Sequence, residues 1–168
     1  MEIWDTVPSG FAKKHPVGDT MGADFFRFGG IMDLVFKVTA LDGDRDCARF
    51  TEEGMEGAKH KNPDRPVSLM SLESRQQVDQ AELRGLCYER FRADVTLDCT
   101  QMPAKGTLIR SGELVLGILP EGKTCWPECT LLQEKLPCPL RDGVRYAWVE
   151  SPGKLCLGDS FKVEEQEK

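Results

Sequence analysis

The stretch TLIRSGELVLGIL, at Thr107–Leu119, indicates the fold class of this chain. Two short apolar runs, Thr107–Arg110 and Glu113–Leu119, lie on either side of the turn signal Ser111-Gly112. In the second run, large aliphatic residues recur at every other position, as one face of a half-buried strand requires. The stretch therefore predicts a tight β-hairpin.

Short strands are also predicted both before and after this hairpin. They are expected at Ile31–Leu41, Arg65–Met70, Ala93–Leu97, Val144–Glu150 and Ser160–Val163. One helix is predicted at Leu72–Arg84, with Ser71 as its N-cap and Gly85 as its stop. Several short strands at close spacing favour a mainly β (α+β) fold, a small barrel or sandwich with one or a few short helices.

The length and composition predict one folded domain. The chain has 168 residues, of which 40% are hydrophobic and 30% are charged. We expect an irregular N-terminal extension at 1–30, a single β-rich domain at 31–163 and a charged tail at 164–168. The N-terminus has neither the basic nor the apolar segment of a secretory signal, so a cytoplasmic protein is expected.

The charge balance makes some classes of partner unfavourable. With 22 basic and 28 acidic residues the net charge is −6, which disfavours nucleic acid and anionic membrane surfaces as partners. It leaves room for a local basic pocket that holds a small anion.

Cysteine is frequent in this chain. The seven cysteines are Cys47, Cys87, Cys99, Cys125, Cys129, Cys138 and Cys156. An odd count without a secretory signal argues against a disulfide framework, so we expect thiols, most of them buried.

Three of these cysteines lie within GKTCWPECTLLQEKLPC, at Gly122–Cys138. Three interpretations remain open for Cys125, Cys129 and Cys138. They pack as small apolar residues, they bind a structural zinc ion, or one is a reactive thiolate that holds a soft metal or a sulfur atom.

A second candidate feature is YERFRADV, at Tyr88–Val95. If this stretch were a strand, alternation would place Arg90 and Arg92 on one face and Phe91 on the other. Two guanidinium groups on one face suit a phosphate or another oxyanion. The alternative is a solvated face on which Glu89 and Asp94 pair with the arginines.

The order of these motifs resembles the MOSC domain, the C-terminal domain of molybdenum cofactor sulfurases, which also occurs alone in small bacterial proteins. RFRADV is followed by the SGELVL hairpin, by GKTCWPEC and by CPLRDGVRYAWVESPGKLCLGDSF. Upstream, Gly54–Ser74 is similar to a segment in which a Gly-Asp-x-His loop leads into a Val-Ser-Leu strand and a helix. The resemblance spans roughly Ile31 to Val163 and implies a distorted, closed β-barrel.

The resemblance also implies site residues. Cys129 matches the cysteine thought to carry sulfur as a persulfide or to ligate molybdenum, with Cys125 or Cys138 as its neighbour. We expect Lys123, Arg90 or Arg92 to lower the pKa of Cys129. The residues expected to bind the pterin phosphate and the rest of the cofactor are Arg90, Arg92, Lys123, His60 and Arg65.

The chain departs from the family pattern at two places. Asp94 stands where the family strand usually has Asn, and the Gly-Asp-x-His loop reads Gly57-Ala58-Lys59-His60, without its acid. Full-length sulfurases also carry an aminotransferase-like domain that binds pyridoxal phosphate, and 168 residues leave no room for both domains. We therefore expect no pyridoxal phosphate on this chain.

The function that the resemblance implies is a stand-alone MOSC protein that binds the molybdenum cofactor or carries sulfur for it. Such a protein would be a sulfurtransferase or a component of a molybdenum-dependent oxidoreductase, with a cysteine desulfurase or a molybdoenzyme as its partner. The alternative is a non-catalytic β-barrel binding module with structural cysteines or a structural zinc ion.

Overall fold

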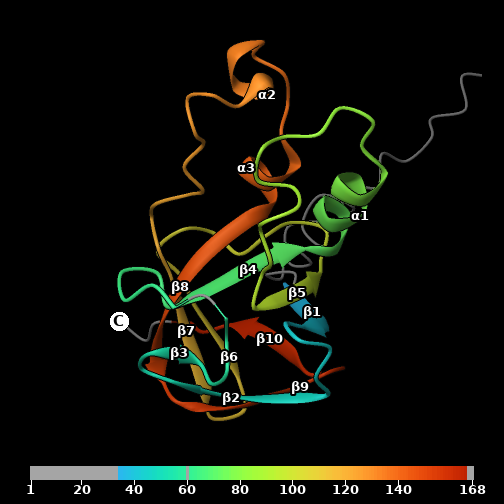
Figure 1. Ribbon diagram of the computed structural model, residues 1–168. Helices are drawn as coiled ribbons and strands as arrows, with labels where there is room; N and C mark the ends of the chain where they lie inside the picture. The colour runs from blue at the N-terminus through green and yellow to red at the C-terminus, as the bar shows by residue number, and fades with distance from the viewer. Residues whose placement is uncertain (1–33, 60, 166–168) are drawn as a thin grey trace, which may run out of the picture. The chain divides into compact units, whose positions relative to one another are not determined.

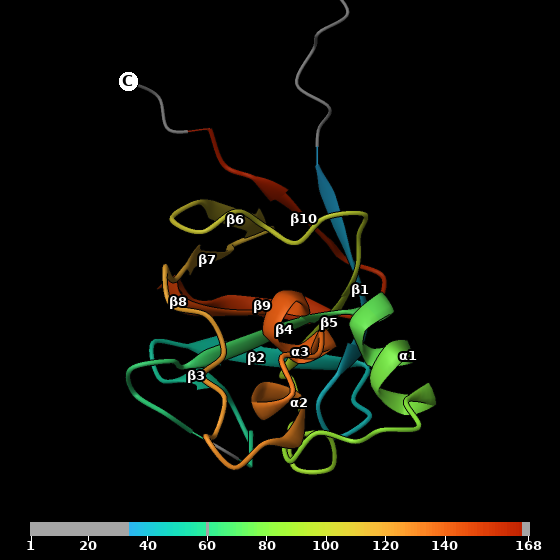
Figure 2. The same ribbon diagram turned by 90° about the horizontal axis from the view of Figure 1, so that it is seen from above.

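The computed structural model of this chain describes residues 34–59 and 61–165. Seven strands form a closed barrel in the order β1-β10-β6-β7-β8-β4-β5 (Figures 1 and 2). They are β1 (Val35–Leu41), β4 (Val67–Ser71), β5 (Val95–Asp98), β6 (Leu108–Ser111), β7 (Leu114–Ile118), β8 (Val144–Ser151) and β10 (Ser160–Val163). The predicted fold class, mainly β with a closed barrel and a few short helices, is confirmed.

The hairpin that indicates the fold class is present. β6 and β7 pair antiparallel, and Ser111 lies opposite Leu114 across the two-residue turn Gly112-Glu113. Gly112 has a φ of 59°, which an L-residue with a side chain adopts only at a cost. The turn therefore lies one residue later than predicted, and the pairing is as expected.

A second sheet, of order β3-β2-β9, packs against the barrel. It consists of β2 (Cys47–Thr51), β3 (Gly54–Met55) and β9 (Gly153–Cys156). The sequence analysis predicted no strand for any of the three. Gly54 has a φ of 106°, and a Cβ there would collide with the carbonyl oxygen of Pro66, so only glycine fits.

Two cysteines of this second sheet are joined. Cys47 and Cys156 lie opposite each other in the β2–β9 register, with Cα atoms 4.0 Å apart, and form a disulfide. The expectation that all seven cysteines are thiols is therefore wrong for this pair. A separation of 109 residues gives no local sequence signal, because only the strand pairing brings the two residues together.

Three short helices lie on one side of the barrel (Figure 1). They are α1 (Leu72–Gln80), α2 (Thr130–Gln133) and α3 (Pro139–Gly143). Ser71 caps α1 as predicted, since its side chain accepts a hydrogen bond from the N–H of Ser74 at 3.1 Å. The predicted end of α1 at Arg84 is wrong, because Ala81 is extended and the Arg84 guanidinium donates to the carbonyl of Val78.

Two hydrophobic cores follow from this arrangement. The first fills the barrel and includes Val67 and Leu69 of β4, whereas Met70, next along the same strand, packs in the second core with α1, α2 and α3. All five residues of β4 are buried, so one face of this strand lines the barrel and the other supports the helices. β4 is thus the common wall of both cores.

The predicted N-terminal extension at 1–30 lies outside the described residues. No helix in the part of the chain that the structure describes has the length and apolarity needed to cross a bilayer.

Candidate functional site

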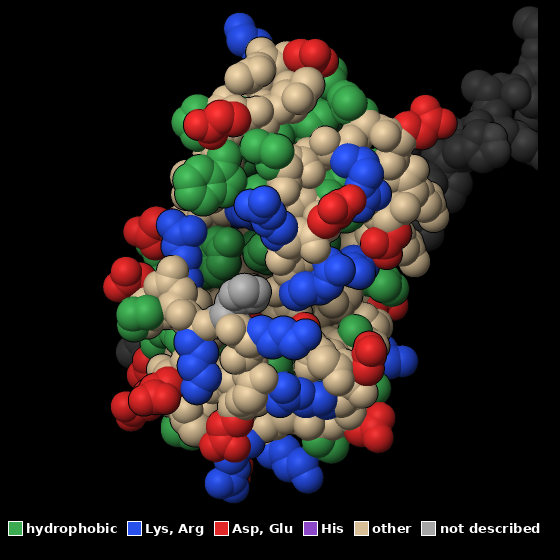
Figure 3. All heavy atoms as spheres, viewed as in Figure 1, with side chains coloured by type: hydrophobic (Ala, Val, Ile, Leu, Met, Phe, Trp, Pro, Cys, Tyr) green, Lys and Arg blue, Asp and Glu red, His purple; other side chains and the backbone are tan. Residues whose placement is uncertain are grey.

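A pocket of about 590 Å³ opens between the barrel and the segments that carry the helices. Ser68 from β4, Tyr146 from β8 and the loops before β5 and after β7 contribute to its wall. Lys and Arg side chains gather across the middle of the face shown in Figure 3. A positively charged region of this kind is notable on a chain with a net charge of −6.

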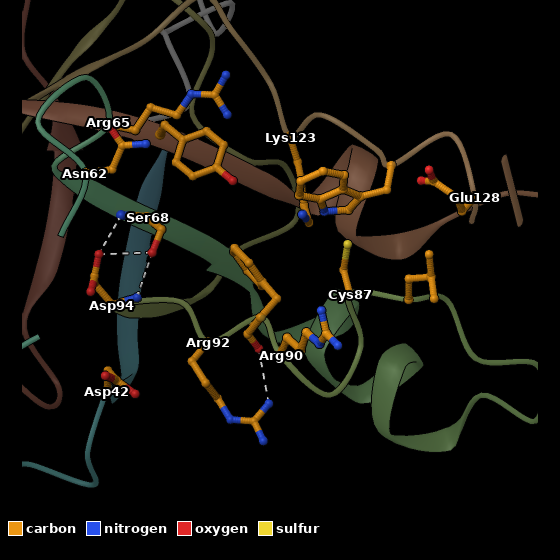
Figure 4. A pocket seen from close by; sticks show the side chains of 14 residues that line it. Asp42, Asn62, Arg65, Ser68, Cys87, Arg90, Arg92, Asp94, Lys123 and Glu128 are labelled. Carbon is orange, nitrogen blue, oxygen red and sulfur yellow. Dashed lines mark hydrogen bonds between the residues drawn. The ribbon is translucent and has the colours of Figure 1, made fainter. Parts of the chain in front are cut away.

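Four of the predicted cofactor-binding residues line this pocket: Arg65, Arg90, Arg92 and Lys123 (Figure 4). Within residues 34–59 and 61–165, none of the ion pairs involves any of the four. Three carboxylates, of Asp42, Asp94 and Glu128, also line the pocket. The pocket is therefore polar and of mixed charge, with cations that no ion pair among the described residues neutralises, as an anion-binding site requires.

Aromatic rings hold two of these cations in place. The guanidinium carbon of Arg65 lies 4.8 Å from the centroid of the Tyr146 ring, and Lys123 Nζ lies 5.1 Å from that of Phe91. Both rings line the pocket, and so does Trp126, which is 64% exposed. Flat apolar faces beside cations suit a planar ligand that carries an anionic group.

A tight turn before β5 positions the arginines. The N–H groups of Arg90 and Phe91 both donate to the carbonyl oxygen of Cys87, at 3.2 and 2.8 Å. The predicted strand alternation is therefore wrong, because β5 begins only at Val95 and Phe91 lines the same pocket as both arginines. The two arginines share one site, as predicted, but through a turn.

The predicted cysteines lie behind this turn. Cys129 and Cys138 are 5% and 8% exposed and pack in the second core with Tyr88, whereas Cys125 is half-buried. We call Tyr88, Cys129 and Cys138 the buried thiol cluster. None of the three predicted cysteines lines the pocket, and the thiol that does so is the half-buried Cys87.

The electrostatic surroundings of Cys129 favour its thiolate form. Its interaction with the backbone of Leu86 lowers the pKa of the thiol most, followed by the backbone of Leu132 and Leu131, and together these outweigh the opposing effect of burial. The direction agrees with the prediction. The cation that contributes is Arg141, in place of the predicted Lys123, Arg90 or Arg92.

The other members of this region have raised pKa values. Burial raises the pKa of Cys125 above its ordinary value, with a further contribution from Cys138. Burial also raises the pKa of Tyr88 to about 12, and a hydrogen bond with Cys138 adds to the effect. The Tyr88 hydroxyl is therefore harder to ionise than that of an exposed tyrosine.

The described residues offer no set of ligands for the structural zinc ion that the sequence analysis left open. Among the described residues, no three His, Cys, Asp or Glu side chains lie where they could hold a metal ion together. His60, predicted as a cofactor-binding residue, lies outside the described residues.

The sequence analysis singled out neither Cys87, Trp126 nor Tyr146 as site residues. Trp126 lies within the quoted cysteine-rich stretch and Cys87 directly precedes the YERFRADV motif, so position in the sequence was the one available signal. Nothing in the local pattern distinguishes Cys87 from the other thiols. Its place in the pocket wall depends on the turn that follows it.

The fold and the pocket define a class: a small closed β-barrel that carries a pocket of mixed charge and aromatic character beside a short helical cover. No protein-family model and no curated protein matches the chain. Solved structures do resemble it. YiiM from Escherichia coli has a TM-score of 0.55 at 19% identity, covering 80% of this chain and 71% of its own.

Two further structures have the same fold. YuaD from Bacillus subtilis has a TM-score of 0.53 at 18% identity, covering 80% of this chain and 98% of its own. A hypothetical protein has a TM-score of 0.59 at 17% identity, covering 80% and 68%. At these identities the likeness establishes a shared fold.

Proposed function

We propose that this chain is a stand-alone MOSC-type protein whose pocket binds the phosphorylated pterin of the molybdenum cofactor. The observation that carries the proposal is the convergence of four cations and three aromatic rings on one pocket. No ion pair within residues 34–59 and 61–165 neutralises these cations, which are Arg65, Arg90, Arg92 and Lys123. The motif order of the sequence and the fold shared with YiiM and YuaD support it.

The residues present suit both parts of such a ligand. Arg90 and Arg92 would hold the phosphate, because guanidinium groups donate in pairs to oxyanions, and Lys123 would add a third charge. Tyr146 and Trp126 would contact the faces of the pterin ring. When bound, the cofactor would supply molybdenum redox or sulfur-transfer chemistry.

The working thiolate is either the predicted Cys129 or the pocket thiol Cys87. As a molybdenum ligand, the thiol must reach the pocket, which favours Cys87. As a sulfur carrier, the thiolate would attack the outer sulfur of a persulfide on a partner desulfurase. The S–S bond of the donor would break and the donor would leave as a thiolate, without any added oxidant.

The test is elemental analysis by plasma mass spectrometry of protein purified from a molybdenum-replete host that makes the cofactor. We expect molybdenum in the wild type and its loss in Arg90→Ala/Arg92→Ala. The matched control, Arg49→Ala/Arg75→Ala, removes two exposed or partly exposed arginines that do not line the pocket and should retain the metal.

Calorimetric titration with inorganic pyrophosphate gives a second readout that does not depend on the metal. We expect binding by the wild type and the control, and loss of binding by the double variant. A wild type that retains no molybdenum and binds no pyrophosphate would overturn the proposal. Cys87→Ser and Cys129→Ser, analysed for molybdenum and for persulfide, decide between the two thiols.

One further outcome has a separate meaning. A wild type that binds pyrophosphate but acquires neither molybdenum nor persulfide sulfur from such a host is the non-catalytic binding module. This alternative predicts identical behaviour for Cys87→Ser, Cys129→Ser and the wild type.

A further inference from the structure

One thiol of this chain opens into the pocket. Cys87 is half-buried and lines the pocket wall, and it also packs against the second core. Cys99 and Cys125 are half-buried as well, but neither lines the pocket. Within the described part of the chain, Cys87 is therefore the one free thiol that a molecule in the pocket would meet.

Backbone hydrogen bonds on both sides hold Cys87 in this position. The N–H of Tyr88 donates to the carbonyl oxygen of Gly85 at 3.1 Å, and the N–H of Phe91 donates to that of Cys87 at 2.8 Å. A Cβ at Gly85 would lie 3.0 Å from Tyr88 Cε1, so the first of these turns closes tightly. Because the thiol is half-buried between ordered turns, a small reagent reaches it from the pocket without local unfolding.

Cations outnumber carboxylates on the side of the pocket where this thiol lies. Figure 4 shows the Cys87 sulfur directed into the pocket, on the side of Lys123 and Arg90. Glu128 is the carboxylate on that side, and the other two carboxylates of the pocket lie across the view. No ion pair among the described residues neutralises Lys123 or Arg90. A reagent with negative charge is therefore favoured at this thiol.

Cys99 provides an internal reference for this effect. It is half-buried like Cys87 but lies outside the pocket wall. Burial raises the pKa of its thiol most, and the charges of Asp98 and Arg145 act on that pKa in opposite directions. We call Cys99 the reference thiol, since it shows how a half-buried thiol reacts without the cations of the pocket.

A small disulfide that carries carboxylates suits both the thiol and the cations. After the Cys87 thiol gives its proton to water, the thiolate attacks one sulfur of the disulfide, whose S–S bond breaks. A new S–S bond joins Cys87 to one half of the reagent, and the other half leaves as a thiolate. Cys87 is thereby oxidised and the leaving sulfur is reduced. The carboxylates would pair with the guanidinium and ammonium groups of the pocket.

We propose that Cys87 is a modification site for small disulfides that carry carboxylates, selected by Arg90 and Lys123. The adduct occupies the pocket and excludes other anions from it, so oxidation blocks binding there and reduction restores it. The inference goes beyond the proposed function, since it requires neither molybdenum nor a pterin.

Two disulfides of opposite charge serve as probes, 3,3′-dithiodipropionate and cystamine. Each has an S–S bond between two-carbon arms, which end in carboxylates in the first and in ammonium groups in the second. Peptide mass spectrometry at low ionic strength gives the rate of modification at each cysteine. The ratio of the dithiodipropionate rate to the cystamine rate should be about tenfold or more higher at Cys87 than at the reference thiol, because clustered charge in a cleft enriches counter-ions by such factors. Intrinsic reactivity of each thiol cancels in this ratio.

Arg90→Ala/Lys123→Ala then tests the cations. We expect the ratio at Cys87 to fall toward that of the reference thiol. The matched control, Arg49→Ala/Lys154→Ala, removes the same charge from two exposed residues outside the pocket and should keep the ratio. Salt at about 1 M should lower the wild-type ratio without any substitution, so misfolding of a variant cannot hide the result.

The adduct also has a consequence for the pocket. Pyrophosphate binding, measured by calorimetric titration, should decrease in proportion to the fraction of Cys87 that dithiodipropionate has modified. Treatment with dithiothreitol should restore it. Full binding by protein modified at Cys87 would show that the adduct leaves the anion site free, and would overturn this part of the proposal.

The outcomes separate this inference from the proposed function. Equal ratios at Cys87 and at the reference thiol in the wild type would overturn the modification site, because exposure alone would then set the reactivity. A ratio that survives both high salt and Arg90→Ala/Lys123→Ala would overturn selection by these cations. A wild type that shows the high ratio but retains no molybdenum and binds no pyrophosphate refutes the proposed function alone.

Discussion

The pocket and the buried thiol cluster lie on the two sides of one turn, Cys87–Phe91, and they differ in charge and in access to solvent. On the pocket side are cations that no ion pair within the described residues neutralises and a half-buried thiol, Cys87. On the other side, Cys129 has a lowered pKa but is 5% exposed. At Cys129 a lowered pKa and access to solvent therefore do not coincide, so neither property alone identifies the working thiol.

The largest expected effect comes from the disulfide, which lies in neither region. Cys47→Ser/Cys156→Ser should lower the free energy of unfolding by about 2–5 kcal/mol, because a cross-link between distant residues restricts the unfolded chain. Urea unfolding without reductant measures it. Pyrophosphate binding should persist under native conditions, since neither cysteine lines the pocket. An unchanged stability would mean that the two cysteines are not bonded.

Thiol labelling tests the comparison directly. Cys87 should react with iodoacetamide about a hundredfold faster than Cys129 or Cys138. Each buried thiol reacts only after a local opening of the structure, and a hundredfold difference in rate corresponds to a free energy of opening of about 2.7 kcal/mol. Mass spectrometry of peptides identifies the labelled residue. Cys87→Ser should remove the labelled peptide of Cys87, whereas the half-buried Cys99 and Cys125 should still react faster than the two buried thiols. If Cys129 reacts first, ionisation outweighs access and the division between the two sides does not hold.

Gly143→Ala should disrupt the packing around the buried thiol cluster and leave the pocket intact. A Cβ at Gly143, in α3, would overlap Ser74 Oγ and lie 2.5 Å from Ser74 Cβ, so α1 and α3 would have to separate. We expect a loss of about 1–3 kcal/mol in urea unfolding and faster labelling of Cys138. The control is Gly122→Ala, whose Cβ would meet only Lys105 Nζ at 3.9 Å. Equal stabilities for the two variants would contradict this packing.

The smallest expected effect concerns Tyr88 at alkaline pH. Its pKa is about 12 in the folded protein against 10.0 for an exposed tyrosine, so the unfolded chain loses this proton first. The protonated Tyr88 hydroxyl therefore makes its full contribution to the free energy of unfolding below pH 10, and this contribution is lost as the pH rises toward 12. Between these values the wild type should lose on the order of 1–2 kcal/mol more than Tyr88→Phe, as measured by urea unfolding. Parallel curves for the two proteins would show that burial does not raise the pKa of the Tyr88 hydroxyl.

Much of the barrel could be predicted from the sequence. The strands at β1, β4 to β8 and β10 carry local signals, either β-branched runs or alternation ended by a turn, and Ser71 marks the start of α1. Local signals fail for β3, which has two residues, and for the end of α1, where the Arg84 side chain caps a carbonyl. Both depend on contacts with other parts of the chain.

The candidate site divides in the same way. The sequence by itself indicated the cations that serve the pocket, because Arg90 and Arg92 lie close together in a chain of opposite net charge. Only the tertiary structure decided that Cys87 faces the pocket, that Cys129 lies behind it and that Cys47 bonds to Cys156. The physical reason is that residue type and spacing fix local conformation and charge. Which side of a turn a thiol faces, and which distant strand it meets, is decided only when the chain packs.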